Sequence, residues 1–321
     1  MTAHVNDISE EVKKQLNNLR SQIVNQLKDY QEVHANFEKR LNKVNDTYDP
    51  DTGSSHSDWS FHFHRNMTIR LRIIIEQNFK VLETLSLVST TRYILECLIW
   101  LRTVNTNPSY VLVFIRDKLK DSKKEKKVLL DRTNTEIALF ERLEKEETAL
   151  RDIRIKTIAA QQDTITEEEL RRLAAADSNK IDRAARHSFS IYREGAKING
   201  YGLQAALLRK QAIPSINNMI EEVEKVISDF NNKYKQQLSE LPKEWKWNQQ
   251  ATIAGLESQY NYIYSLTSRI LHAQPGSILT DQKCLEPQEA IILLDFIYIS
   301  LIECRRLLES TWMHPAVDRA N

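Results

Sequence analysis

Glycine and proline are scarce in this chain of 321 residues, which contains six glycines and seven prolines. These two residues dominate tight turns, so their scarcity leaves room for only a small number of long helices. We therefore predict an all-α fold. The length is sufficient for one large domain or two ordinary ones with a sizeable core.

The chain also has few cysteines and almost no net charge. The three cysteines, Cys97, Cys284 and Cys304, lie far apart in apolar helical contexts. This spacing excludes a cysteine zinc site, and buried thiols are typical of a reducing compartment, so we expect a cytoplasmic protein. The 45 lysines and arginines nearly balance the 44 aspartates and glutamates, which excludes a uniformly basic nucleic-acid binder. The Walker sequence is absent, and the glycines at 195–202 lack the spacing of a nucleotide fingerprint, so we expect no cofactor.

Uninterrupted apolar runs are missing as well. The longest strongly apolar stretch, residues 85–104, carries Arg92 and Glu96 in its middle. Moving two charged side chains into hydrocarbon is costly, so we predict no transmembrane segment. The polar N-terminal segment does not have the character of a signal peptide.

Two highly charged segments carry a narrow apolar stripe. Residues 7–45 place apolar side chains three and four residues apart, and residues 116–160 repeat such a stripe among many charges. We expect these segments to pair as a long antiparallel coiled-coil stalk. The stripe of 7–45 also suits dimerisation or a partner helix, so a homo-oligomer or a protein partner stays open as an alternative.

The remaining apolar helices form the expected body of the protein, a helical bundle of residues 65–115 and 178–310. Residues 46–64 contain turn sequences and three histidines, and we expect them to form a loop. Two histidines two residues apart share a metal only on a strand or loop, and no cysteine joins them, so we predict no metal site. Residues 311–321 are expected to form a tail.

Three arginines open the apolar helix of the bundle. Arg65, Arg70 and Arg72 are close in sequence, and no acidic residue lies between Arg65 and Glu76. Such a positive patch could bind phosphate, which makes RNA or another nucleic acid a candidate partner. The alternative is an ordinary solvated helix face.

The strongest candidates for chemistry lie on two distant helices. Arg92 and Glu96 are four residues apart and share one helix face, and Tyr264, Ser268 and His272 advance in steps of four along another helix. We predict that these faces meet. His272 would then act as general acid or base, and Arg92 would hold a phosphate or carboxylate that Glu96 helps to orient. The alternative is a buried polar network that fixes helix packing.

A resemblance rests on the same two segments. STTRYILECLIWL (89–101) and YNYIYSLTSRILHAQPGS (260–277) resemble an uncharacterised family of helical bacterial proteins. In that family an early Arg-x3-Glu recurs with a late Tyr/Ser-x3-His and a loop containing proline and serine. The resemblance covers two halves of one bundle and implies a fold, whereas the family has no assigned reaction.

As a bundle, the chain is also similar to the HEPN ribonucleases of toxin and phage-defence systems. In those enzymes a histidine follows an arginine after four to six residues. Here Arg269 and His272 have two residues between them, and Arg183 and His187 have three, which departs from that motif. A likeness of fold alone is an argument by analogy.

Two hypotheses of function follow, and they leave open whether the protein is an enzyme. The first is a bacterial cytosolic interaction protein, of a phage-defence or toxin type, that acts through self-association or a partner. The second is a metal-independent, HEPN-like ribonuclease or other hydrolase that uses His272 with Arg92 and Glu96.

Overall fold

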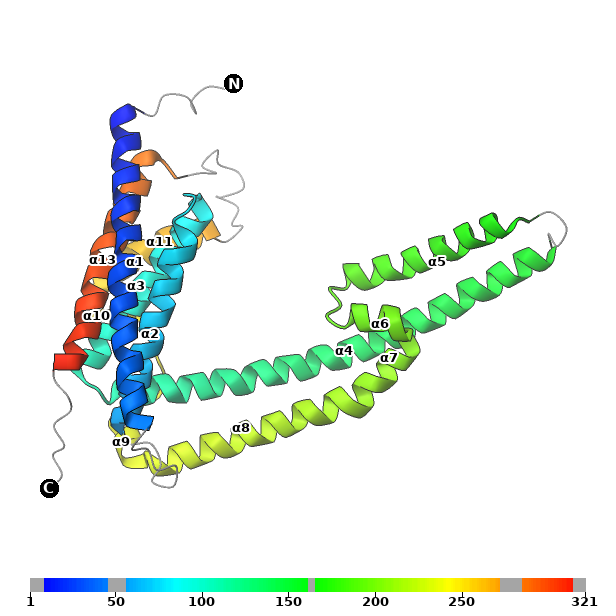
Figure 1. The fold of residues 1–321 in the computed structure, drawn as a ribbon. Helices are drawn as coiled ribbons and strands as arrows, with labels where there is room; N and C mark the ends of the chain where they lie inside the picture. Colours follow the sequence, from blue (N-terminus) through cyan, green and yellow to red (C-terminus); the bar gives the residue numbers. More distant parts are fainter. Residues whose placement is uncertain (1–8, 46–55, 161–164, 272–284, 314–321) are drawn as a thin grey trace. The chain divides into compact units, whose positions relative to one another are not determined.

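The chain is helical and divides into two compact units (Figure 1). The computed structural model describes residues 9–45, 56–160, 165–271 and 285–313. Unit 1 comprises residues 1–115 and 236–321, and unit 2 comprises residues 116–235. No β-strand occurs among the described residues, and the predicted all-α fold is confirmed.

Unit 1 is a helical bundle in which segments distant in sequence lie side by side. Helix α13 packs against both α1 and α3, α1 also packs against α2, and α11 packs against α3 (Figure 1). The helices of this unit are α1 (Glu10–Asn45), α2 (His56–Asn78), α3 (Thr84–Thr106), α10 (Trp247–Ile253), α11 (Glu257–Leu271) and α13 (Pro287–Met313).

Helix α3 is the central element of unit 1. It is apolar around most of its circumference, and such a helix is stable only when other helices cover it. Ile94, Leu98 and Leu101 are fully buried, and Trp100 stacks on Trp245 from the segment before α10. Across the bundle, the hydroxyl of Tyr30 donates a hydrogen bond of 2.8 Å to the carbonyl of Leu301.

Unit 2 is built on the long helix α4 (Tyr110–Ala160), which begins in unit 1 and continues through unit 2. The elements that follow are α5 (Glu167–His187), α6 (Arg193–Asn199), α7 (Tyr201–Leu207), the single π-helical turn η1 (Leu208–Ala212), and α8 (Ile213–Lys233). The short helix α9 (Lys235–Ser239) then leads back to unit 1.

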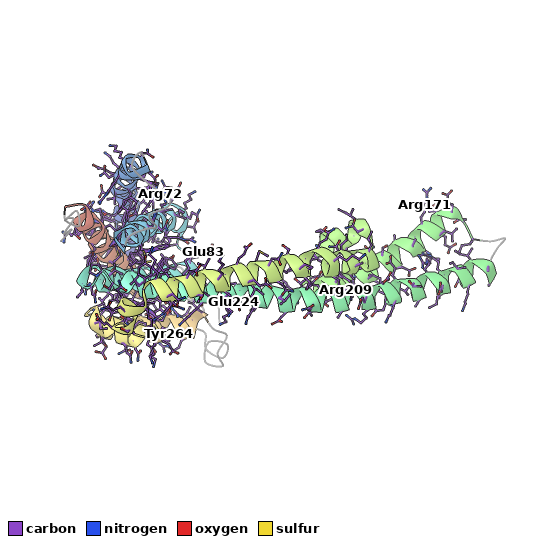
Figure 2. All side chains as sticks on the ribbon, turned by 90° about the horizontal axis from the view of Figure 1, so that it is seen from below. Arg72, Glu83, Arg171, Arg209, Glu224 and Tyr264 are labelled. Carbon is purple, nitrogen blue, oxygen red and sulfur yellow. The ribbon has the colours of Figure 1, made fainter. Side chains whose placement is uncertain are left out.

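The apolar core of unit 2 is small. Phe140 and Leu143 of α4 pack with Ile181 and Ala185 of α5 and with Tyr201 of α7. Ion pairs extend this packing in both directions along α4. They join Arg154 to Asp177 of α5 at 2.6 Å, and Lys123 to Glu224 of α8 at 2.7 Å. Figure 2 labels Glu224 on α8.

The structure differs from the expected coiled-coil stalk. Helix α1 lies in unit 1 and packs against α2 and α13, whereas residues 116–160 lie in unit 2. Between Leu19 and Phe37 the apolar stripe of residues 7–45 is mostly buried, as its spacing predicts, with Ile23 and Tyr30 inaccessible to solvent. A stripe of this kind specifies that a partner helix exists but does not specify which helix it is.

Three expected boundaries also differ. Residues 56–64 form the first turns of α2 rather than a loop, because Phe63 and Met67, one turn apart, are both buried. Residues 178–235 belong to unit 2 and not to the bundle. Helix α13 extends to Met313, into the expected tail, and residues 314–321 lie outside the described part.

In the described part of the chain, every helix is either too short or too polar to cross a lipid bilayer.

Candidate functional site

The predicted meeting of the two chemistry-bearing helices is present in unit 1. The Nε of Arg92 donates to the Oε1 of Glu96 at 3.0 Å within α3. The guanidinium carbon of Arg92 lies 4.4 Å from the centre of the Tyr264 ring on α11, which is a cation–π contact. Tyr264 in turn stacks on Tyr260 with ring centres 5.4 Å apart.

Arg92 is therefore held on two sides. Desolvation would lower its pKa, but the hydrogen bond and the charge of Glu96 more than compensate, and the pKa of Arg92 rises above its ordinary value. Ser268 lies one turn beyond Tyr264 and is half-buried. His272, the predicted acid or base, lies outside the described residues. The described part of this site can hold one anionic group or simply join α3 to α11.

The three arginines of the expected phosphate patch do not form one surface. Arg65 is paired with Glu38 of α1, with 2.6 Å between Nη2 and Oε1. Arg72 is seven residues from Arg65, so it lies on the same face of α2, about 20° away. Arg70 is exposed and lies about 140° around the helix from Arg65.

The histidines of α2 do not converge. His64 is buried, and its Nδ1–H donates to the carbonyl of Ser60 at 2.7 Å. His62 is exposed and lies on the opposite side of the helix, whereas the side chain of His56 lies outside the described part. The residues that the structure describes contain no group of three or more histidine, cysteine or carboxylate side chains that could hold a metal ion.

Unit 2 contains a second candidate site, which the sequence did not point to. Three large apolar side chains within ten residues of one another are exposed to solvent, and we name them the unit 2 apolar surface. They are Phe189 (80% exposed), Ile191 (48%) and Ile198 (85%). Phe189 and Ile191 lie in the loop between α5 and α6, and Ile198 lies on α6.

The backbone of this loop adopts a strained conformation. Phe189 has a φ of 52°, and it is the only described residue other than glycine with a positive φ. This left-handed region costs an L-residue with a large side chain about 1–2 kcal/mol, so the surrounding structure must stabilise it.

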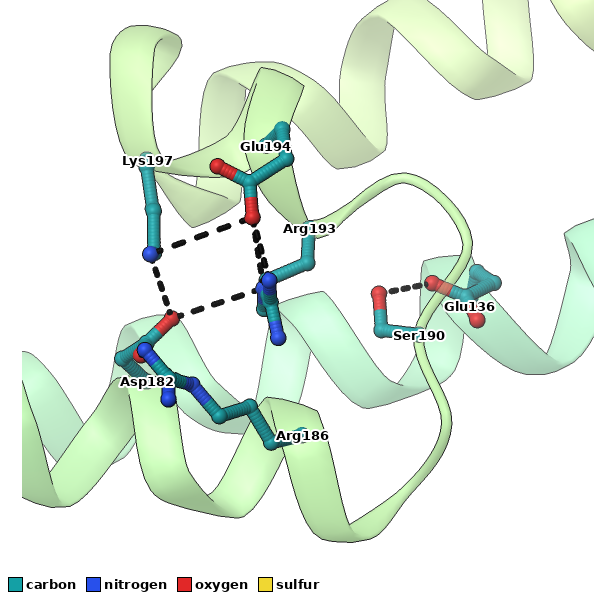
Figure 3. Close-up of polar contacts among 7 residues, drawn as sticks. All are labelled: Glu136, Asp182, Arg186, Ser190, Arg193, Glu194 and Lys197. Carbon is teal, nitrogen blue, oxygen red and sulfur yellow. Dashed lines mark hydrogen bonds and ion pairs between the residues drawn. The ribbon is translucent and has the colours of Figure 1, made fainter.

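A buried carboxylate of α4 stabilises the loop through hydrogen bonds. Glu136 of α4 is fully buried and accepts a hydrogen bond from the hydroxyl of Ser190 (Figure 3). It also accepts one from the backbone N–H of Ile191, at 3.2 Å. The guanidinium of Arg132 lies 2.6 Å from the Oε1 of Glu136. The same guanidinium donates to the carbonyl of Ser188 at 2.7 Å and to that of Phe189.

A second charged group fixes α6 onto α5. Asp182 of α5 lies 2.7 Å from Arg186, 3.2 Å from the Nζ of Lys197 and 3.7 Å from Arg193 (Figure 3). Desolvation alone would raise the pKa of Asp182, but the hydrogen bond from Lys197 and the nearby cations lower it below its ordinary value. Because Ile198 follows Lys197, this network also sets the position of Ile198.

A surface pocket of about 380 Å³ opens beside the loop. Its lining combines charged and apolar groups from about three turns of α4 with one residue of the loop: Arg132, Thr135, Glu136, Ala138, Leu139, Arg142 and Ser188. An exposed aromatic side chain next to a pocket of mixed polarity is an arrangement that suits the binding of another protein.

Comparisons with protein-family models, curated proteins and solved structures found no match to this chain.

Proposed function

We propose that this protein is a cytoplasmic interaction protein that acts by binding a protein partner through the unit 2 apolar surface. The observation that carries the proposal is Phe189. Its side chain is four-fifths exposed while its backbone is held in a strained conformation by Arg132 and by contacts of the adjoining residues with Glu136.

The energetics support a binding role. An exposed phenylalanine forgoes about 1.5–3 kcal/mol of burial free energy, and its left-handed backbone adds a further cost. Within unit 2 this burial free energy is not gained, because the side chain of Phe189 remains 80% exposed. A partner that covers the ring would recover the burial term without a large ordering cost, because the hydrogen bonds to Glu136 and Arg132 already fix the loop.

The free thiols support the proposed cytoplasmic location. Cys97 and Cys304 are buried and unpaired in unit 1, and burial raises the pKa of each thiol. Free thiols that do not react are typical of proteins of the reducing cytoplasm.

Site-specific photo-crosslinking in the source cells tests the proposal. A photoreactive phenylalanine analogue at position 189 or 198 is expected to give an adduct of one discrete mass. The matched control is position 155 on α4, where Ile155 is 55% exposed and lies outside the surface. Glu136→Ala should weaken the adduct at 189, because the loop loses its anchor. Equal adducts at 155 and 189, or none at 189 and 198, would refute the proposal.

The contact between Arg92 and Tyr264 favours a second candidate function. We propose as the alternative a metal-independent hydrolase or ribonuclease in which Arg92 binds an anionic group of the substrate and Glu96 orients it. The test is hydrolysis of labelled RNA and of model esters by the purified protein. Arg92→Lys keeps the charge but loses the planar donor set, so it should abolish turnover while the protein stays folded, with only a small decrease in melting temperature from the lost contacts with Glu96 and Tyr264. Absence of turnover by the wild-type chain would reject this alternative.

A further inference from the structure

The outward face of α13 carries apolar side chains at heptad spacing. Ile292 (61% exposed) and Ile299 (56%) are seven residues apart. The half-buried Ile302 follows Ile299 by three residues, on the same side of the helix. Asp295 and Arg306 complete the series, so residues 292, 295, 299, 302 and 306 advance in steps of three and four. This spacing is that of a helix face that packs against another helix.

The other faces of α13 are already occupied within unit 1. Leu294, Ile297 and Leu301 are fully buried against the bundle. Ion pairs line both edges: Glu303 binds Arg102 of α3 at 2.5 Å, and Arg305 binds Asp29 of α1. Figure 1 shows α13 (red) beside α1.

The two charges in the heptad series have no ionic partner within the described part of the chain. Neither Asp295 nor Arg306 takes part in an ion pair there, and both side chains are exposed. They carry opposite charge and lie on the same face, eleven residues and three turns apart.

We propose that this face binds the same face of a second copy of the protein, with the two α13 helices antiparallel. The register that sets Asp295 opposite Arg306 of the second copy also sets Ile299 opposite Ile302 of the second copy. Two-fold symmetry repeats both contacts, which gives an isologous interface with two ion pairs around a central layer of four isoleucines. Ile292 then lies at the edge, opposite Glu309 of the second copy.

The charge pattern favours an antiparallel over a parallel arrangement of the two α13 helices. In a parallel pair in register, each aspartate would face an aspartate and each arginine an arginine, and like charges in contact are unfavourable. Only the antiparallel pairing places opposite charges together while keeping apolar layers between them. A single helix face buries less area than a standard protein interface, so we expect a dissociation constant on the order of 1–100 µM.

Charge reversal tests the pairing. Asp295→Arg and Arg306→Asp each convert two attractions into two repulsions, and each variant should dimerise about tenfold more weakly than the wild type. When the two variants are mixed in equal amounts, both contacts become Arg–Asp pairs again, and dimers containing one chain of each kind should form with near wild-type affinity. Sedimentation velocity with one variant fluorescently labelled measures this directly.

The matched control is Glu76→Arg, a reversal at an exposed position of α2, which should leave association unchanged. Circular dichroism establishes that all variants keep the helix content of the wild type. The proposal is overturned if the wild type is monomeric at about 500 µM, if Glu76→Arg has the same effect as the other reversals, or if mixing fails to restore association. It goes beyond the proposed partner binding, because Phe189→Ser should remove the partner adduct and leave this dimer intact.

Discussion

Replacement of Glu136 by alanine should release the loop that carries Phe189. Glu136 is fully buried, and its removal leaves the guanidinium of Arg132, the hydroxyl of Ser190 and the N–H of Ile191 without their acceptor. Removing one member of a buried, hydrogen-bonded ion pair costs about 3–5 kcal/mol. Arg132 is itself partly exposed and can turn towards water, so we expect the lower end of this range, about 3 kcal/mol.

Hydrogen exchange and urea denaturation measure the effect. The amides of residues 189–191 should exchange at least a hundredfold faster, because about 3 kcal/mol corresponds to roughly two factors of ten in the opening equilibrium. The control is Glu146→Ala on the same helix, where Glu146 follows Arg142 at the same spacing but is partly exposed and lies 3.9 Å from it. That change should cost less than about 0.5 kcal/mol. Equal effects of the two substitutions, or unchanged exchange in the loop, would refute the reasoning.

Three further predictions concern stability. Trp100→Ala removes a buried ring that stacks on Trp245, and it should lower the free energy of unfolding by about 3–5 kcal/mol in urea titrations. Burial lowers the pKa of His64, and the hydrogen bond to Ser60 opposes this only in part. The stability gained from neutral His64 is therefore complete above about pH 6.5 and falls as the pH drops towards the lowered pKa of the folded state, with a slope of at most about 1.4 kcal/mol per pH unit. Gly200→Ala should cost about 1–3 kcal/mol, because Gly200 has a φ of 82° while a Cβ there would touch nothing.

A matched control, a test variant and a contradicting outcome check these three predictions in turn. Tyr262→Ala removes an exposed ring from α11 and should cost less than about 0.5 kcal/mol, in contrast to Trp100→Ala. His64→Gln should flatten the dependence of stability on pH between 5 and 6.5, and an unchanged slope would show that another group titrates there. A neutral effect of Gly200→Ala would mean that the loop relaxes to a negative φ.

One contact of unit 1, that between α3 and α11, could be predicted from the sequence. Arg92 and Glu96 are charged groups inside an apolar run, and Tyr264 belongs to a polar stripe on another helix, so we expected each group to supply polar partners for the other. In the structure Arg92 and Glu96 are partly exposed and Tyr264 is 41% exposed. The contact of Arg92 with Tyr264 confirms that inference. The partner of α1 was not predictable in the same way, because its apolar stripe fits any helix of similar length.

The unit 2 apolar surface could not be predicted from the pattern of residues. In SFSI (188–191), polar and apolar residues alternate, and this alternation is compatible with partial burial of Phe189. What exposes the ring is a positive φ at a residue type that rarely adopts it, and this depends on Glu136, more than fifty residues earlier. Similarly, Arg65 and Arg70 appeared to form one patch because they are close in sequence, whereas the helix turns them to different sides.

The π-helical turn η1 determines the rotational phase of everything that follows it in unit 2. A π-turn contains more residues per turn than an α-turn, and each residue adds about 100° of rotation in an α-helix. If residues 208–212 closed into regular α-helix with all their residues kept, Ile216 and Ile220, both now buried, would turn by about 100° towards solvent, whereas deletion of one residue there would leave them nearly in phase. The π-turn therefore absorbs one residue that an uninterrupted α-helix could not accommodate, and in this way it keeps Ile216 and Ile220 of α8 buried.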